Sequence, residues 1–526
     1  MKKIKNTKQS FERSALLLLL SSVLVKVIGA LFKIPLASNY ILGDLGFGYF
    51  SAAHDLYTPI FMLASAGLPL VVSKIIAEYV ATNNSSKLLS VFFESKKMFI
   101  KVGILLATVL TVIIFILSVF VLDFKQGVLY FVALVPSLLI CFIISVYRGY
   151  FEGIENINPV AVSNVIEAVI KLVFGLLFAF VVLKLTGDYI FAAAAATFAI
   201  AVGSFVALIY LKLRFKAINS INKTVTDKTQ KQKIIATIYA VFLPVVLSSM
   251  IGSIVSLIDA LTVKSFISNA VDYEFLKGLN SLEKATFLYG VRSKAFTVYN
   301  LIPTFVAAIL VSALPTLASA YAKGDNEQFK NRVSKVLKFA SIIIFPASFG
   351  LFALGKNIIL FLYGNSPSSD LGGQMLSVFG LAAIFTGFAI ILTTILQAVD
   401  ASKTALINII IGTVFKIMFN ILFVRIPSIN IMGSAYSTLI CYLIIFVLNC
   451  ICLCKKIKTV PMLNSVVKPF LAAVICVVCA YFIVAFLGGG NTVFALSLVV
   501  AVVVYFSILI ATKCITKEDY GKNNKY

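Results

Sequence analysis

Two apolar segments near the start of this sequence carry charged side chains whose types and spacing could do chemistry. In 14–36, Lys26 and Lys33 are spaced i and i+7, so they share one face of a helix. The next apolar segment holds the only histidine of the chain, His54, directly before Asp55. An ionisable residue inside a membrane helix costs ~2.5–3.5 kcal/mol on insertion scales, so it normally faces a cavity or a partner. The pattern therefore predicts a cationic surface that binds an anion.

The depth of these charged residues in the bilayer indicates whether they face a cavity or the membrane interface. A rise of about 1.5 Å per residue places Lys26 near the middle of a bilayer and Lys33 in its outer half. A cavity-facing position is favoured for Lys26, whereas Lys33 has the alternative of snorkelling to the outer interface. We predict that His54 and Asp55 are counter-charges to these lysines. The alternative is that they titrate or release the lysines during a conformational cycle, since histidine changes charge near neutral pH.

Charged residues also lie in later apolar segments. Glu167 and Lys171 form an i, i+4 pair in the stabilising orientation, so mutual neutralisation is the simplest interpretation. Asp259 lies near the outer end of its predicted helix, where it is a further candidate counter-charge. Arg292 and Lys294 open their predicted helix at its outer end, and both anion binding and interfacial anchoring are open for them. Cations outnumber carboxylates inside the helices, so a water-filled cavity lined by them would suit an anionic substrate.

Composition determines the class of fold. The chain is 60% hydrophobic and only 13% charged, with a mean hydropathy of +1.03, whereas soluble domains are roughly a quarter charged. Apolar runs long enough to cross ~30 Å of hydrocarbon recur from end to end. We predict an all-α polytopic membrane protein with fourteen helices. They are 14–36, 49–76, 99–122, 127–149, 159–183, 189–212, 235–263, 291–320, 337–360, 373–397, 404–424, 431–454, 466–487 and 492–513.

The net charge of +24 is distributed unevenly among the loops. If the N-terminus is cytoplasmic, most basic residues fall in the two tails and in the cytoplasmic loops, above all in 213–234. This bias is the positive-inside rule, and it predicts that both termini are cytoplasmic. The surplus therefore indicates topology and attraction to membrane lipids rather than binding to nucleic acid.

Two pairs of segments indicate an internal repeat, a common feature of transporters. The stretch 66–91 aligns with 312–336, which places Pro69 over Pro315, and both prolines are predicted to kink their helices. A second alignment pairs 161–178 with 405–423. We predict two parallel six-helix lobes. The predicted parts are a basic tail (1–13), an N-terminal lobe (14–212), a basic linker (213–234), a C-terminal lobe (235–454), an extra helix pair (466–513) and a second tail (514–526).

Four stretches resemble one family of bacterial membrane proteins. They are KVIGALFKIPLASNYILGDLGFGYFSAAHDLYTPIFMLASAGLPLVVSKIIAEY (26–79), YRGYFEGIENINPVAVSNVIEAVIK (147–171), SLIDALTV (256–263) and SALPTLA (312–318). They resemble the stage V sporulation protein B and polysaccharide biosynthesis proteins of low-GC Gram-positive bacteria. Those proteins belong with the lipid II flippases of the mouse virulence factor type, in the multidrug/oligosaccharidyl-lipid/polysaccharide exporter superfamily. The resemblance implies two lobes around a central cationic cavity that alternates between inward- and outward-open forms. It also implies that the last helix pair lines a groove for a lipid tail.

The resemblance also implies roles for particular cations. Cations on the first, second and eighth helices are important in the lipid II flippases. Lys26 matches the first arginine of the first helix by position, and Lys33 matches the second within a residue. Arg292 and Lys294 lie near the arginine of the eighth helix. The second helix has no counterpart, because its neighbourhood here contains Asp55.

These observations predict a lipid II flippase of peptidoglycan biosynthesis, acting as a monomer in the cell membrane of a bacterium. The membrane potential, or an ion gradient with a coupling cation, would drive the anionic headgroup outward. The alternatives are an exporter of another undecaprenyl-linked glycan (teichoic acid, capsule or spore cortex) and a cation-coupled multidrug exporter. A membrane glycosyltransferase or ligase is a further alternative, but no enzymatic activity is expected because the longest external loop, roughly 264–290, has no recognisable catalytic signature. No cofactor or metal is expected either: no Walker A motif is present, and Cys476 and Cys479 lack a second ligand pair.

Overall fold

Long helices make up the regular structure of this protein. The computed structural model describes residues 11–81, 85–116, 128–218, 238, 257–263, 265–267, 273–457, 462–488 and 490–514. Within these ranges the regular structure is helical and contains no β-strand, which confirms the predicted all-α class. The chain divides into two compact units. Unit 1 is Met1–Ser265 with Gly278–Gly290, and unit 2 is Phe266–Lys277 with Val291–Tyr526.

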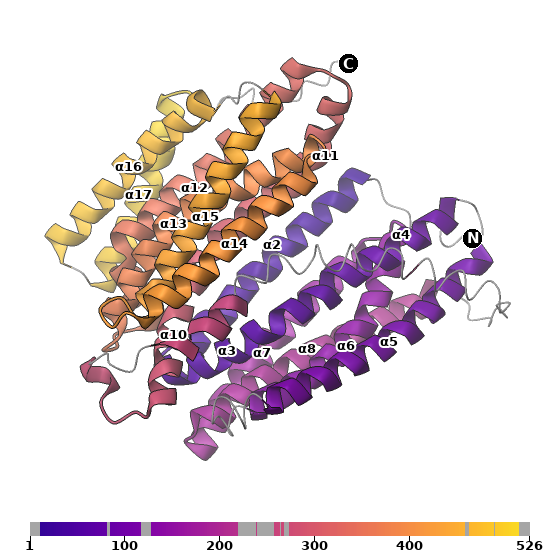
Figure 1. Cartoon of the computed structure of the whole chain (residues 1–526), viewed down its shortest axis with the longest axis horizontal. Helices are drawn as coiled ribbons and strands as arrows, with labels where there is room; N and C mark the ends of the chain where they lie inside the picture. The colour runs from indigo at the N-terminus through magenta and orange to yellow at the C-terminus, as the bar shows by residue number, and fades with distance from the viewer. Residues whose placement is uncertain are drawn as a thin grey trace. The chain divides into compact units, whose positions relative to one another are not determined.

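Unit 1 is built around helix α6, which contacts α4, α5 and α8, while α8 contacts α7 and α7 contacts α2. Figure 1 shows these helices in indigo to magenta. Their bounds are α2 Phe11–Leu36, α3 Gly43–Met62, η1 Leu63–Gly67, α4 Leu68–Ala81, α5 Ser85–Ile116, α6 Val128–Gly153, α7 Asn158–Thr186 and α8 Tyr189–Ile218. Helix α10, Ser281–Tyr299, belongs to unit 1 as far as Gly290.

Unit 2 shows the same order of packing around helix α13, which contacts α11, α12 and α15, while α15 contacts α14. The last two helices add to this arrangement: α16 packs on α12, and α17 packs on α16 (Figure 1, yellow). The bounds are α11 Leu301–Ala322, α12 Asn326–Tyr363, α13 Ser369–Ala398, α14 Ser402–Arg425, α15 Met432–Ile457, α16 Met462–Leu487 and α17 Asn491–Ala511, with a short 3-10 helix, η4, at Glu274–Leu276.

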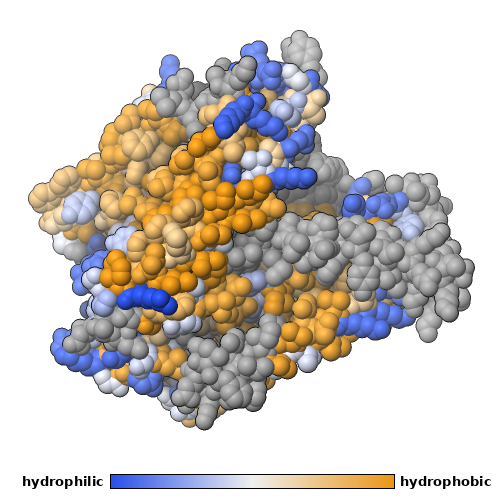
Figure 2. Space-filling model, in the orientation of Figure 1, coloured by the Kyte–Doolittle hydropathy of each residue, from blue (hydrophilic) through white to orange (hydrophobic). Residues whose placement is uncertain are grey.

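The described residues contain eleven helices long and apolar enough to cross a membrane. Figure 2 shows hydrophobic residues over the sides of the helices in view and hydrophilic residues near their ends. These eleven correspond to eleven of the predicted spans. Of the other three, 14–36 lies within α2, 99–122 overlaps α5, and 235–263 lies mainly outside the described residues. The predicted tails and most of the linker, 1–10, 219–234 and 515–526, also lie outside them. A multi-pass membrane protein is confirmed, and the total of fourteen spans stays a prediction.

The start of the eighth predicted helix is wrong. Helix α10 begins at Ser281, ten residues before the predicted start, and the chain continues as α11 after Asn300. The reason is a reciprocal cap: the backbone N–H of Glu283 donates to Asn280 Oδ1 (2.9 Å), and the N–H of Asn280 donates to Glu283 Oε2 (3.0 Å). The polar residues of this turn suggested a loop. Arg292 and Lys294 consequently lie well inside a helix and do not open it.

Helices α5 and α12 also begin earlier than predicted, at Ser85 and Asn326. The side chain of Asp325 caps α12 by accepting a hydrogen bond from the N–H of Gln328 (2.8 Å). Hydropathy detects only the apolar part of such a helix. Its polar first turns have to be inferred from capping residues.

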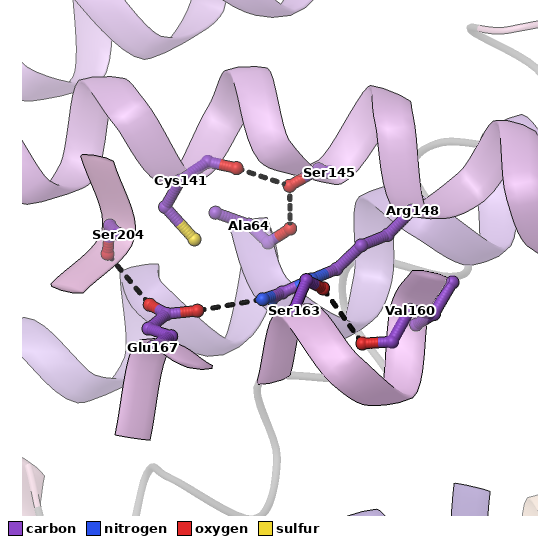
Figure 3. Close-up of polar contacts among 8 residues, drawn as sticks. All are labelled: Ala64, Cys141, Ser145, Arg148, Val160, Ser163, Glu167 and Ser204. Carbon is purple, nitrogen blue, oxygen red and sulfur yellow. Dashed lines mark hydrogen bonds and ion pairs between the residues drawn. The ribbon is translucent and has the colours of Figure 1, made fainter. Parts of the chain in front are cut away.

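The segment around Pro69 is irregular but well packed. A π-helical turn, η1, lies between α3 and α4 just before this proline. The hydroxyl of Ser145 on α6 donates both to the carbonyl of Ala64 in that turn and to its own Cys141 carbonyl (2.7 Å), as Figure 3 shows. A neighbouring helix thus satisfies a carbonyl where the regular helical pattern is interrupted. At Pro315, α11 is helical, and the kink predicted there stays a prediction.

Glycines allow two close helix contacts inside unit 1. A Cβ on Gly149 of α6 would lie 2.6 Å from the carbonyl oxygen of Pro69 on α4. A Cβ on Gly290 of α10 would collide with the carbonyl of Asp44 at the start of α3. Such close approach of helix backbones is typical of small residues in membrane proteins. The second contact holds the first half of α10 against α3.

Candidate functional site

Helix α2 presents the two lysines that the sequence analysis singled out. Lys26 has an exposed side chain, although surrounding protein atoms partly desolvate it, and Lys33 is half-buried. Between them, Phe32 is 1% exposed and packs where a Cβ on Gly175 of α7 would collide with its ring. The Phe32 ring also meets Phe50 of α3 edge-on, at 5.8 Å between centroids. These contacts of Phe32 hold the part of α2 that carries Lys26 and Lys33 against α3 and α7.

On α3, the side chains of His54 and Asp55 are half-buried and adjacent. His54 Nδ1 lies 3.7 Å from Asp55 Oδ1 and 3.2 Å from the hydroxyl of Thr58. The hydroxyl of Tyr289, on the part of α10 that belongs to unit 1, donates to Asp55 Oδ2 at 2.7 Å. Asp55 is therefore held by a group that no sequence pattern indicated, 234 residues away.

Electrostatic interactions connect these groups across three helices of unit 1. Lys33 and Lys171 both act on the charge of His54, as does Asp55. Lys26 and Lys33 in turn act on Lys171. We refer to Lys26, Lys33 and Lys171 as the lysine cluster. Unit 1 thus brings together, within electrostatic range, five of the residues that were predicted from sequence.

The neighbouring carboxylate, Glu167, has hydrogen-bond partners that were not predicted. Arg148 Nη2 on α6 donates to Glu167 Oε2 at 2.8 Å, and the Ser204 hydroxyl on α8 donates to Oε1 at 2.7 Å (Figure 3). The Nε of Arg148 also donates to Ser163 Oγ at 3.1 Å. Glu167 also acts electrostatically on Lys171, as predicted, but it shares its charge with Arg148, so mutual neutralisation of Glu167 and Lys171 alone stays a prediction. The geometry of α6 and α8 supplies a guanidinium and a hydroxyl that the i, i+4 spacing did not reveal.

Lys171, one turn along α7, is within electrostatic range of Glu167 but also contacts α2. Its Nζ lies 5.7 Å from the centroid of the Phe32 ring on α2, an arrangement in which a cation is attracted by the ring face. Helix α7 therefore places an acid and a base, one turn apart, in two different environments. Glu167 belongs to the interface with α6 and α8, whereas Lys171 belongs to the interface with α2.

The remaining predicted residues lie elsewhere. In unit 2, Arg292 is fully buried with its guanidinium 4.3 Å from the centroid of the Phe296 ring. Lys294 is 3% exposed and its Nζ lies 5.5 Å from the Tyr363 ring centroid. Asp259 lies in a described helical stretch, 257–263, and is fully buried. A common binding surface of Arg292 and Lys294 with the lysine cluster stays a prediction.

Unit 2 also contains buried polar contacts between α14 and α15. The Nζ of Lys416 donates to Thr438 Oγ1 at 2.7 Å, and the amide of Asn408 donates to Asn449 Oδ1 at 2.9 Å. All four side chains are buried, so these bonds satisfy polar groups within the membrane-spanning part of the unit. Their arrangement is that of structural contacts, and they offer no reactive group to a substrate.

The described part of the site can therefore bind a charged ligand. In the described part of unit 1, the lysine cluster and His54 interact electrostatically, and Asp55 and Glu167 accept hydrogen bonds from Tyr289, Arg148 and Ser204. Among the described residues, no group of three histidine, cysteine or acidic side chains could hold a metal ion. Such an arrangement suits recognition of an anion.

Two solved structures illustrate the fold of this chain. The fold matches the lipid II flippase MurJ in an inward closed conformation with a TM-score of 0.71, over 94% of this chain and 98% of that one, at 16% identity. It also matches an inward-facing multidrug resistance MATE family transporter of the MOP superfamily with a TM-score of 0.62, over 82% of this chain and 98% of that one, at 15% identity. The chain therefore shares the fold of these two proteins, and this likeness defines its class by fold.

Within this class, the chain belongs to the polysaccharide biosynthesis protein family, whose profile matches residues 11–321. The MatE profile matches residues 290–422. Three relatives from Bacillus subtilis (strain 168) are similar over most of their length. The membrane protein YabM is 26% identical over 81% of this chain and 76% of the relative. The lipid II flippase MurJ is 23% identical over 82% and 80%, and stage V sporulation protein B is 23% identical over 89% and 88%. The resemblance read from the sequence is confirmed.

Proposed function

We propose that this protein is a flippase for a polyprenyl-diphosphate-linked saccharide, with lipid II as the favoured substrate. The observation that carries the proposal is the lysine cluster, which places cations inside membrane-spanning helices of unit 1. A relative that is itself named a lipid II flippase supports the choice of substrate. The protein would act in the bacterial cell membrane, with both termini in the cytoplasm.

The chemistry of the site fits this substrate. A diphosphate bears several negative charges and cannot cross hydrocarbon unaided, but lysine ammonium groups can hold it by charge-assisted hydrogen bonds. Lysine binds phosphate as a point charge, whereas arginine can bind it bidentately, so a lysine site suits capture followed by release. Moving negative charge out of a negative interior is favourable by about 2.3 kcal/mol per charge per 100 mV. The membrane potential, or an ion gradient carried by a coupling cation, would therefore drive flipping.

The proposed architecture has fourteen helices in two six-helix lobes plus the C-terminal pair. The matching order of packing around α6 in unit 1 and α13 in unit 2 supports a repeat. In this architecture, Arg292 and Lys294 would form the second part of the binding surface. Asp55 and His54 would adjust its charge during alternating access, because a ligand shifts a conformational equilibrium only through its different affinity for the two states.

The second candidate is an exporter of another undecaprenyl-linked glycan, such as a teichoic acid, capsule or spore-cortex precursor. One observation favours it: α3 carries Asp55, and no cation, at the level where the lipid II flippases have a cation on the second helix. Related proteins also include a sporulation protein. A cation-coupled multidrug exporter fits less well, because the lysine cluster would repel cationic drugs.

Depletion of this protein in the bacterium that encodes it tests the proposal and separates the two glycan candidates. Lipid II on the outer face is labelled selectively in depleted cells, and the cells are rescued with wild type, Lys26→Ala or Lys33→Ala. We expect lipid II to accumulate inside, and both variants to reach the membrane but fail to rescue. If outer lipid II is unchanged in a strain without a second flippase, the substrate is another lipid-linked glycan.

A further inference from the structure

Helix α7 contains a cation, Lys171, that shares its expected counter-charge, Glu167, with Arg148. Both carboxylate oxygens of Glu167 have partners, Arg148 on Oε2 and Ser204 on Oε1. The side chains of the Arg148–Glu167 ion pair are only 6% and 13% exposed, so solvent screens this pair little. Glu167 and Arg148 neutralise each other. Glu167 also acts on Lys171, one turn along the same helix, but a single carboxylate cannot balance both cations.

The position of Lys171 is defined by the contact of α7 with α2. Gly175, one turn further along α7, admits the ring of Phe32, and Lys171 Nζ lies 5.7 Å from the centroid of that ring. Phe32 directly precedes Lys33, so the amine of Lys171 and the lysine face of α2 lie on the same interface. Lys171 is half-buried and stands near the middle of the 29-residue helix α7.

The charges around this interface do not balance. The lysine cluster contributes three positive charges and Arg148 a fourth, whereas two carboxylates, Asp55 and Glu167, act on members of this group. In the described part of the chain, neither Lys26 nor Lys171 forms an ion pair with a carboxylate. Like charges held together in a membrane are unfavourable unless a ligand of opposite charge joins them. A ligand with two or three negative charges fits this excess.

We propose that Lys171 is a third anion-binding residue of the site and that it binds the diphosphate of a lipid-linked substrate together with Lys26 and Lys33. This inference rests on the proposed function and adds to it, because the binding surface then extends from α2 onto α7. Cations on two helices, α2 and α7, would then contact the headgroup. A diphosphate, which has two phosphoryl groups, is better matched to three cations on two helices than to two cations on one.

The test measures binding of undecaprenyl diphosphate to the purified full-length protein by titration under native mass spectrometry, with uncharged undecaprenol as the reference. Inorganic pyrophosphate is a separate arm, which distinguishes a free diphosphate from a lipid-linked one. The variants are Lys171→Gln, which removes the charge, Lys171→Met, which keeps the apolar stem, and Lys171→Arg, which keeps the charge. The matched control is Lys184→Gln: Lys184 lies on the same helix, over the Phe180 ring at 5.8 Å, and is exposed.

We expect Lys171→Gln and Lys171→Met to weaken binding of undecaprenyl diphosphate about ten-fold or more, as expected for loss of a charge-assisted hydrogen bond. Lys171→Arg and Lys184→Gln should bind nearly as wild type does. If Lys26→Gln weakens binding of undecaprenyl diphosphate while both neutral variants of Lys171 bind it normally, the inference about Lys171 is overturned. The proposed function is unaffected by that result. If the wild type binds undecaprenyl diphosphate no better than undecaprenol, the proposed function itself fails. If pyrophosphate alone binds as tightly, the lipid-linked substrate is overturned.

Discussion

Removing the charge of Glu167 should destabilise unit 1 strongly. Its carboxylate accepts from Arg148 at 2.8 Å and from Ser204 at 2.7 Å, and the ion-paired side chains are 13% and 6% exposed. Glu167→Gln keeps the shape of the side chain but leaves a buried guanidinium without a counter-charge. Breaking a buried pair by removing one partner costs about 3–5 kcal/mol. The loss should therefore be several times larger than for a surface ion pair.

Thermal unfolding in detergent can be followed through the cysteines. The chain has eight cysteines and no tryptophan. Cys141, Cys441, Cys476 and Cys514 are buried free thiols, so a dye that fluoresces on reaction with thiols reports their exposure. At roughly 2–4 °C per kcal/mol for domains of about this size, Glu167→Gln should lower the apparent Tm by about 6–20 °C.

Two control variants test whether the loss of stability comes from the unpaired buried charge. The double variant Arg148→Gln/Glu167→Gln has no unpaired buried charge and should recover much of the lost stability. Lys356 and Asp370 form a shorter pair, at 2.5 Å, but their side chains are 60% and 67% exposed. Lys356→Gln should therefore change stability by less than about 1 kcal/mol. The reasoning is refuted if Glu167→Gln melts with the wild type, or if the double variant is no more stable than the single one.

Three further changes test the packing of the helices. Gly149→Leu would force a side chain against the Pro69 carbonyl and should cost about 1–3 kcal/mol or prevent membrane insertion; normal yield and Tm would contradict the contact. Tyr289→Phe removes the hydroxyl that binds Asp55 and should cost about 1.5–3 kcal/mol, measured as a lower Tm, and an unchanged Tm would speak against this bond. Asn280→Ala removes the cap of α10 and should cost about 0.5–2 kcal/mol. Faster hydrogen exchange in the first turn of α10 would show this loss, and unchanged exchange would contradict it.

The interiors of the helices were predictable and their ends were not. Long apolar runs identify membrane helices because lipid requires every backbone polar group to bond within the segment. The polar first turns of α10 and α12 have no such requirement. The cap of α10 was nevertheless readable, since Asn280 and Glu283 have the spacing of a capping box. The π-helical turn before Pro69 could not be foreseen, because it depends on Ser145 of a neighbouring helix.

The candidate site was predictable to the extent that its charges interrupt apolar runs. Lys26 and Lys33 were identified for that reason, and so was Lys171. The partner of Glu167 was not, because a contact 19 residues away on another helix depends on tertiary packing. An i, i+4 pair contributes only about 0.2–0.5 kcal/mol, so the spacing of Glu167 and Lys171 does not prevent Glu167 from pairing with a buried guanidinium. Arg148 follows a long apolar stretch of its helix, and this feature alone could have drawn attention to it.

The most direct measurement of the central claim uses purified protein in liposomes that carry fluorescent lipid II. The rate at which the headgroup crosses the bilayer is measured for the wild type, for Lys26→Gln/Lys33→Gln and for the matched control Lys184→Gln. The account predicts that the wild type and the control flip lipid II well above protein-free liposomes, and that the double variant is at least about ten-fold slower. It would be contradicted if the double variant flipped as fast as the wild type. A wild type no faster than protein-free liposomes would contradict lipid II as the substrate.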